Sequence, residues 1–167
     1  MDSQAFTLLH VVISLIAIGS GFAVLYGLLA ATQMRGLTAL FLLTSIATSA
    51  TGFFFHREQI LPSHIVGGIA LAVLAVTVVA LYIYHLRGAW RGIYVIGAVV
   101  SLYFNMFVLV AQAFLKIPSL HELAPKGSEP PFAIAQGILL VLFIALGTSA
   151  FKRFQPSNEN RGSMAAS

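Results

Sequence analysis

Apolar runs long enough to cross a membrane follow one another along most of this sequence. A helix needs roughly 20 apolar residues to cross the hydrocarbon layer of a bilayer, because each residue adds about 1.5 Å to its length. The sequence therefore predicts an all-α integral membrane bundle of five transmembrane helices. These helices are expected at residues 6–31, 37–55, 63–84, 92–117 and 131–151.

The composition agrees with burial in lipid. Hydrophobic residues make up 59% of the 167 residues, charged residues only 8%, and the mean hydropathy is +0.93. A soluble domain carries about a quarter charged residues, so this chain has too few charges to cover a surface that faces water. The absence of cysteine excludes disulfides, thiolate metal sites and cysteine nucleophiles.

Basic residues are divided unequally between the two sides of the predicted bundle. Because cytoplasmic loops are enriched in Lys and Arg, the more basic side is expected in the cytoplasm, with the N-terminus outside and the C-terminus inside. The charges occur singly or in pairs without a basic stripe, so the net charge of +4 does not indicate nucleic acid as a partner. The predicted cytoplasmic side holds Arg35, Arg87, Arg91, Lys152, Arg153 and Arg161, and the outer side holds Arg57, Lys116 and Lys126.

The chain is expected to form one transmembrane domain over residues 1–154, followed by a disordered cytoplasmic tail over residues 155–167. The longest connection, residues 118–131, is too rich in proline for a continuous helix, although residues 119–123 can form one turn. Aromatic side chains at the cytoplasmic boundary predict an interfacial belt. Its members are Tyr82, Tyr84, Trp90 and Tyr94.

Small and hydroxyl-bearing residues predict how the helices pack. Helix association in lipid depends on close approach, so small residues at four-residue spacing are expected to form grooves. Such residues are Gly19, Ala23, Gly27 and Ala31 in the first segment, and Gly68 and Ala72 in the third. The hydroxyls of the second segment are expected to bond back to the preceding helical turn, which requires no functional role. They belong to Thr44, Ser45, Thr48 and Ser49.

Four residues on the last two predicted helices are candidates for a ligand pocket. Asn105 and Gln112 are seven residues apart and share a helix face, because two turns take about seven residues. Gln112 and Gln136 are expected at similar depth on neighbouring helices, facing the bundle interior or a wet cavity. Together with Tyr103 they predict a pocket for a quinone, a lipid or another small apolar molecule. The simpler alternative is that these amides only join helices through hydrogen bonds.

Histidine and acidic side chains gather on the predicted outer side. His10, His56, His64 and His121 lie there together with Glu58. Two imidazoles on different helices can hold haem b, and imidazole with carboxylate can hold a divalent metal ion. His10 and His64 are the best-placed pair for haem b, and the other three residues complete the candidate metal ligands. No diagnostic metal-binding spacing is present in the sequence.

Four stretches of the sequence carry a resemblance to known proteins: TGFFF at 51–55, LPSH at 61–64, FNMFVLVAQ at 104–112 and LAPKGSEPPF at 123–132. Together they resemble a family of small multi-span inner-membrane proteins of proteobacteria that has no assigned activity. The resemblance covers roughly residues 37–150. It implies a location in the bacterial inner membrane and implies no reaction.

Two functions are compatible with these features. The leading hypothesis is a non-enzymatic binding or accessory protein in the lipid bilayer, for an apolar ligand, another membrane subunit or a second copy of the chain. The alternative is a membrane redox protein that holds haem b or a metal ion through His10 and His64. Transport coupled to ions is less favoured, because no predicted span carries a charged residue in its middle.

Overall fold

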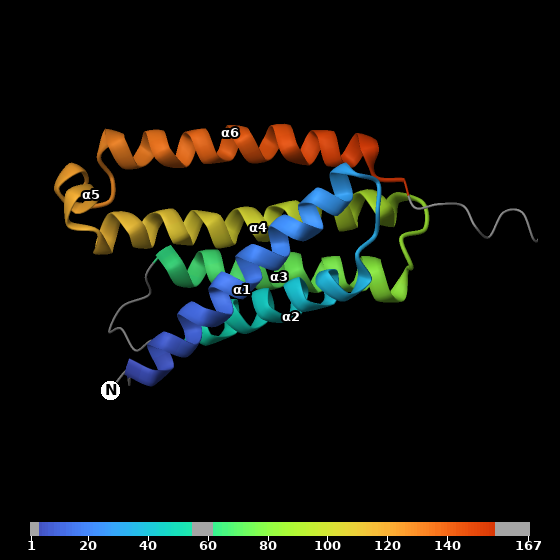
Figure 1. Cartoon of the computed structure of the whole chain (residues 1–167), viewed down its shortest axis with the longest axis horizontal. Coiled ribbons are helices and arrows are strands. Elements are labelled where there is room, and N and C mark those ends of the chain that lie inside the picture. Colours follow the sequence, from blue (N-terminus) through green and yellow to red (C-terminus); the bar gives the residue numbers. More distant parts are fainter. Residues whose placement is uncertain (1–3, 55–61, 156–167) are drawn as a thin grey trace, which may run out of the picture.

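The computed structural model describes residues 4–54 and 62–155, with the backbone alone for residues 62–64. All regular structure in these two ranges is helical, as the sequence predicts (Figure 1). The elements are α1 (Gln4–Leu29), α2 (Arg35–Gly52), α3 (Pro62–Val78), the π-helical turn η1 (Val79–Ile83), α4 (Ala89–Lys116), α5 (Pro118–Leu123) and α6 (Pro130–Arg153). The predicted disordered tail lies outside the described residues, apart from Gln155.

Each predicted span coincides with a long helix. When η1 is counted with α3, the largest differences are at the start of α4, which lies at 89 instead of 92, and at the end of α2, which lies at 52 instead of 55. Prolines set the boundaries around the long connection, since a proline opens both α5 and α6. The single turn expected at residues 119–123 is present as α5.

The long helices run back and forth along one direction (Figure 1). The N-terminus, the end of α2, the start of α3 and the short helix α5 lie at one end, called here the α5 end. The turns at residues 30–34 and 84–88 lie at the opposite end together with the end of α6, and we call this the C-terminal end. Consecutive long helices are therefore antiparallel.

Four described helices are long and apolar enough to cross a membrane: α1, α3 with η1, α4 and α6. The chain is accordingly an all-α, multi-pass membrane protein. The helix α2 has 18 residues and a lower hydropathy than these four, because it begins with Arg35 and carries many hydroxyl side chains. Its hydroxyl residues are Thr38, Thr44, Ser45, Thr48, Ser49 and Thr51.

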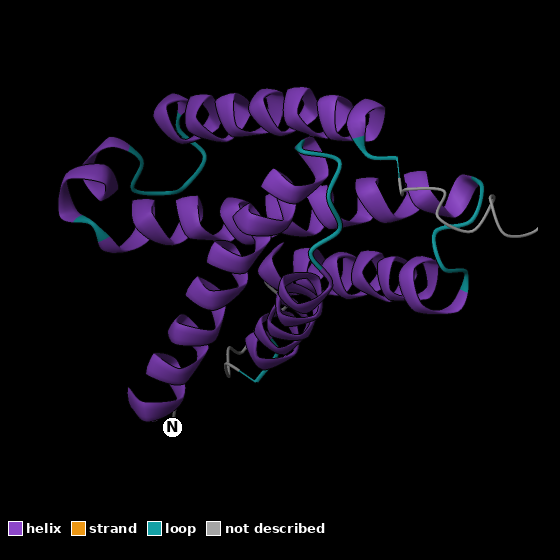
Figure 2. Ribbon diagram, turned by 45° about the vertical axis from the view of Figure 1, so that its right-hand side comes forward, coloured by secondary structure: helices purple, strands orange, loops and turns teal. Residues whose placement is uncertain are grey.

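The buried core occupies mainly the C-terminal half of the bundle. The central helix α4 packs against α1, α3 and α6. The buried residues of α1 begin only at Ala17, and those of α2 end at Ser45. In α4 they lie between Gly92 and Leu102, with Phe114 as an isolated exception. Towards the α5 end, α1 and α2 lean away from α4 and α6 (Figure 2).

The predicted small-residue grooves match the close contacts only in part. A Cβ atom at Gly19 or Gly68 would meet nothing within 4 Å. At the predicted position Gly27, a Cβ atom would lie 2.8 Å from the Thr32 carbonyl oxygen. Close approaches occur also at two positions that were not predicted: Gly21, where a Cβ atom would lie 2.6 Å from Leu102, and Gly67. The contact face of α1 follows its crossing of α2 and α4, and a four-residue repeat drifts from a helix with about 3.6 residues per turn.

Tyr94 belongs to the core and not to the predicted aromatic belt. Its side chain is 1% exposed, and its ring packs against Phe154 with centroids 5.9 Å apart. Its hydroxyl lies 3.3 Å from Thr38 Oγ1 on α2. Two other predicted members of the belt, Tyr84 and Trp90, stack on each other with centroids 3.8 Å apart.

Candidate functional site

Polar side chains connect α2 to α1 and α4 along most of its length. Each pair joins a hydroxyl of α2 to a polar group of another helix, so together they form a line from one end of the bundle to the other. We call these six residues the polar interface. From the C-terminal end to the α5 end, the pairs are Thr38 with Tyr94 (3.3 Å), Ser45 with Asn105 (3.0 Å) and Thr51 with His10 (2.7 Å).

The hydroxyls of α2 take two different roles. Thr44 donates to the Leu40 carbonyl over 2.7 Å, so it bonds back to its own helix as the sequence predicts. Thr51 also donates to its own helix and pairs with His10 as well. Ser45 instead accepts a hydrogen bond from the side-chain Nδ2 of Asn105 on α4. The prediction that these hydroxyls serve only their own helix is therefore wrong for Ser45.

The half of the polar interface near the α5 end is not closed by side chains of the described residues. No described residue of α1 before Ala17 is buried, and none of α2 after Ser45. Asn105, His10 and Thr51 are all only half-buried. In a bundle that lies in lipid, partly uncovered polar groups are costly, so such positions normally face water, a cavity or a bound molecule.

Three buried polar atoms lack a hydrogen-bond partner among the described residues: Thr48 Oγ1, Ser101 Oγ and Gln136 Oε1. Ser101 lies one turn before Asn105 on α4, and Thr48 lies about one turn after Ser45 on α2. The two hydroxyls therefore flank the central pair of the polar interface. A buried polar group left unpaired costs about 1–3 kcal/mol, so this region offers more hydrogen-bonding groups than its own residues satisfy.

The structure divides the four predicted ligand residues among three places. Tyr103 packs against Phe143 of α6 with ring centroids 5.8 Å apart, at the contact between α4 and α6. Gln136 is buried at the same contact and donates from Nε2 to the Phe107 carbonyl over 3.1 Å. Asn105 lies at the polar interface. Gln112 is exposed, so these residues do not line one common pocket.

The prediction that Gln112 faces the bundle interior is wrong. Its spacing places it on the same face of α4 as Asn105, as expected. That face is covered at Asn105 by Ser45 of α2, but α1 and α2 lean away from α4 further towards the α5 end (Figure 2). Gln112 lies one turn before the last residue of α4, at a depth where an exposed amide can approach the membrane surface.

Only two of the predicted metal ligands, His10 and His121, have described side chains, and these two are not brought together. No group of three or more His, Asp or Glu side chains that could hold a metal ion occurs among the described residues. His121 is exposed on α5, and α5 lies apart from the first turns of α1, which carry His10 (Figures 1 and 2). His56 and Glu58 lie outside the described residues, as does the side chain of His64.

Sequence reasoning missed Ser45, Thr48 and Thr51 as parts of a possible site. A local signal was available, because Thr38 and Ser45 are two turns apart on α2 and so lie on one helix face. Such a face opposite Asn105 is compatible with hydrogen bonds between helices. The partners of these hydroxyls depend on how α2 crosses α4, which the sequence pattern does not specify.

No protein-family model matches the chain, and neither a curated protein nor a solved structure is detectably similar to it. The resemblance to small inner-membrane proteins of proteobacteria therefore stays a prediction.

Proposed function

We propose that this multi-pass membrane protein is a non-enzymatic binding protein for an apolar molecule with a carbonyl-bearing head, of the quinone or lipid class. The head group would lie at the polar interface, in the half near the α5 end. One observation carries the proposal: Asn105 lies eleven residues before Lys116, about 16 Å from that helix end, and is only half-buried. A polar amide at this depth needs a cover that the described chain does not supply.

Hydrogen-bond donors in the polar interface and directly beside it are free to bind a carbonyl oxygen. The amide nitrogen of Asn105 has two hydrogens, and its bond to Ser45 uses one of them. The hydroxyls of Ser101 and Thr48 are buried without a partner among the described residues. Carbonyl oxygens only accept hydrogen bonds, so a quinone or ester head complements these donors.

The apolar part of such a ligand would lie along the first half of α1. This segment is strongly apolar, and most of its large side chains are exposed in the described structure. They are compatible with an isoprenoid or acyl chain, because in a bilayer apolar side chains already face lipid tails, and a bound chain takes the place of those tails through van der Waals packing. The exposed side chains are Leu8, Leu9, Val11, Val12, Leu15 and Ile16.

The proposal includes α2 as the fifth span and a location in the bacterial inner membrane, with the N-terminus outside. The antiparallel course of α2 between α1 and α3 supports a crossing, although its hydropathy is lower than that of the other four helices (Figure 1). The excess of basic residues at the C-terminal end supports the orientation, because cytoplasmic loops are rich in Lys and Arg.

A binding experiment with matched variants tests this function. The full chain in phosphatidylcholine nanodiscs is titrated with a short-chain ubiquinone analogue, and bound analogue is measured after separation from free analogue. Separately, lipids and quinones that copurify with the chain are identified by mass spectrometry.

We expect Asn105→Leu to weaken binding about tenfold, the ratio that corresponds to about 1.4 kcal/mol. The matched control Gln112→Leu removes an exposed amide from the same helix and is expected to bind as the unchanged protein does.

Folding is checked independently for both variants by circular dichroism and gel filtration. Asn105→Leu also loses a hydrogen bond between helices, which is worth about 0.6 kcal/mol in such bundles, so it is expected to remain folded. The proposal fails if neither the quinone analogue nor a copurified lipid binds, or if the two variants bind equally. It also fails if the chain purifies with a stoichiometric protein subunit and binds neither class of ligand after that subunit is removed.

A further inference from the structure

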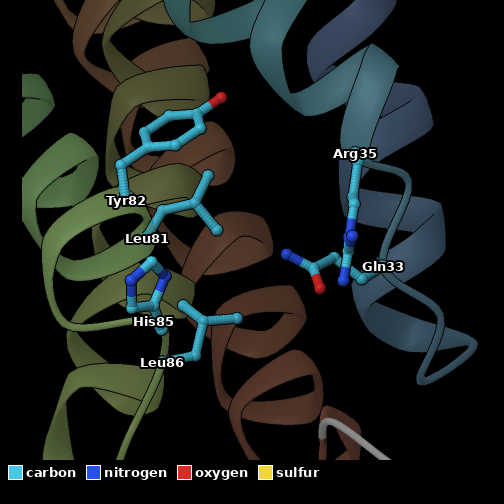
Figure 3. Close-up of a pocket in the computed structure, with 6 residues that line it drawn as sticks. All are labelled: Gln33, Arg35, Leu81, Tyr82, His85 and Leu86. Atoms are coloured by element: carbon cyan, nitrogen blue, oxygen red, sulfur yellow. The ribbon is translucent and has the colours of Figure 1, made fainter.

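A cavity of about 290 Å³ opens at the C-terminal end, away from the open half of the polar interface at the α5 end. It separates the turn between α1 and α2 from the turn that follows η1. In Figure 3, Gln33 and Arg35 lie on one side of the cavity, and Tyr82 and His85 lie on the other side beside Leu81 and Leu86. The residues that line it are Gln33, Arg35, Leu81, Tyr82, His85 and Leu86.

The lining combines hydrogen-bond donors with an apolar base. The guanidinium of Arg35, the amide of Gln33, the ring of His85 and the hydroxyl of Tyr82 all can donate. No side-chain hydrogen bond or ion pair joins any of these four groups to another residue of the described ranges. No acidic side chain lines the cavity. The four donors are therefore available to a bound acceptor.

The charges around the cavity are all of one sign. The C-terminal end carries five described basic residues: Arg35, Arg87, Arg91, Lys152 and Arg153. The two acidic residues of the described chain, Glu122 and Glu129, both lie at the α5 end. The electrostatic field at this cavity therefore attracts anionic ligands.

The backbone beside the cavity is held in an unusual conformation. The α-helical course of α3 changes to the π-helical turn η1, whose residues Leu81 and Tyr82 line the cavity. The next two lining residues, His85 and Leu86, have φ angles of +49° and +59°. π-Helical turns and non-glycine residues with positive φ are both frequent at binding sites, where they direct side chains towards a ligand.

We propose that this cavity binds a phosphate group. Arg35 would form a two-pronged pair with two phosphate oxygens, since a guanidinium matches that geometry. Gln33, Tyr82 and His85 would donate to the remaining oxygens, and Leu81 and Leu86 would contact the carbon atoms next to the phosphate. The volume of about 290 Å³ suits a small head group. The phosphate can belong to an anionic phospholipid of the leaflet at this end or to a free ion, and the chemistry of recognition is the same.

Two sets of measurements on the full chain distinguish these sources. In the first, the chain is placed in nanodiscs of phosphatidylcholine alone, or of equal parts phosphatidylcholine and phosphatidylglycerol, and retained phosphatidylglycerol is counted by native mass spectrometry. In the second, inorganic phosphate is titrated in detergent and its affinity is measured by calorimetry. Each set uses the unchanged protein, Arg35→Gln, Arg35→Lys and the control Arg87→Gln. The control removes an equal charge from the same end without touching the cavity.

Arg35→Gln is expected to weaken binding at least tenfold, because a hydrogen bond to a charged group is lost. Arg35→Lys is expected to recover part of the affinity, and Arg87→Gln is expected to leave it within twofold.

Selective retention of phosphatidylglycerol identifies the lipid as the source, whereas a response to inorganic phosphate alone identifies the free ion. Absence of both responses overturns the proposal. Equal losses in Arg35→Gln and Arg87→Gln also overturn it, because they show general attraction to a basic surface. Arg35 is exposed, so its substitution leaves the buried core unchanged.

Discussion

Charged side chains hold both ends of α6. At its start, the carboxylate of Glu129 accepts hydrogen bonds from the backbone N–H groups of Lys126 (3.1 Å) and Ser128 (3.0 Å). At its end, the guanidinium of Arg91 donates to the carbonyls of Phe151 and Phe154. A negative charge at a helix start and a positive charge at a helix end also interact favourably with the helix dipole. These contacts connect each end of α6 to a neighbouring segment of the chain.

The Glu129 contact predicts a pH-dependent change in the connection between α5 and α6. Desolvation raises the pKa of this carboxyl, but the bonds from Lys126 and Ser128 and the charge of Lys126 outweigh it, so the pKa lies below its ordinary value of 4.5. The stabilising contribution is therefore complete above pH 4.5 and is lost as the pH falls through the lowered folded-state pKa. The amide proton shifts of Lys126 and Ser128 are expected to titrate in that lower range in NMR spectra. In Glu129→Gln this titration should be absent, and a midpoint above 4.5 in the unchanged protein would contradict the prediction.

Glycine positions determine how closely the helices approach one another. A Cβ atom at Gly97 of α4 would lie only 2.0 Å from Thr77 Oγ1. Thr77 is completely buried and donates to the Val73 carbonyl over 2.7 Å, so its hydroxyl is fixed on α3. At Gly92, a Cβ atom would lie 2.6 Å from the ring of Phe151 on α6. The same helix α4 thus receives a close contact on each of two sides, which agrees with its central place.

The contact between α3 and α4 predicts a large effect of one methyl group. Gly97→Ala is expected to destabilise the protein by about 1–3 kcal/mol, since a packed core accommodates extra atoms only through shifts. Gly19→Ala adds the same methyl group where nothing lies within 4 Å, so it is expected to be neutral or slightly stabilising. Unfolding in increasing SDS, followed by circular dichroism, measures both. Thr77→Ala in the Gly97→Ala background should recover much of the loss, and equal stability of the two single variants would refute this packing.

The whole molecule is asymmetric from end to end. The C-terminal end has the buried core, the basic residues and the cavity beside Arg35. The α5 end has both acidic residues of the described chain and the open half of the polar interface. Whether α2 crosses the membrane decides on which side these segments lie. A crossing by α2 places the N-terminus and the connection between α5 and α6 on the same side of the membrane.

Single cysteines test the number of crossings directly, because the natural sequence contains none. Gln4→Cys, Arg87→Cys and Ser128→Cys are each treated with a membrane-impermeant maleimide in intact cells. With five crossings, Gln4→Cys and Ser128→Cys are expected to react from outside, and Arg87→Cys only after permeabilisation. If α2 does not cross, Gln4→Cys and Ser128→Cys react from opposite sides. Reversal of all three results would keep five crossings but would contradict the predicted orientation.

The sequence by itself determined the helices and their order. Apolar length and proline position are local properties, so they specify that α4 ends before Pro118 and that α6 begins at Pro130. The polar character of Asn105 and Gln136 was likewise sufficient to predict that these residues contact other helices, which both do. Gln112 has the same chemistry and a matching helix face, yet it is exposed.

Only the tertiary structure decided which faces meet. Because α1 and α2 diverge from α4, Gln112 is exposed. The angle at which α1 crosses its neighbours brings Gly21 into close contact and leaves Gly19 without one. Tyr94 lies in the core, where its hydroxyl contacts Thr38 of α2. Two turns far apart in the chain place Arg35 and His85 on opposite sides of one cavity. Crossing angles depend on many side chains of several helices at once. The apolar period of a single helix therefore does not specify the angle at which it crosses its neighbours.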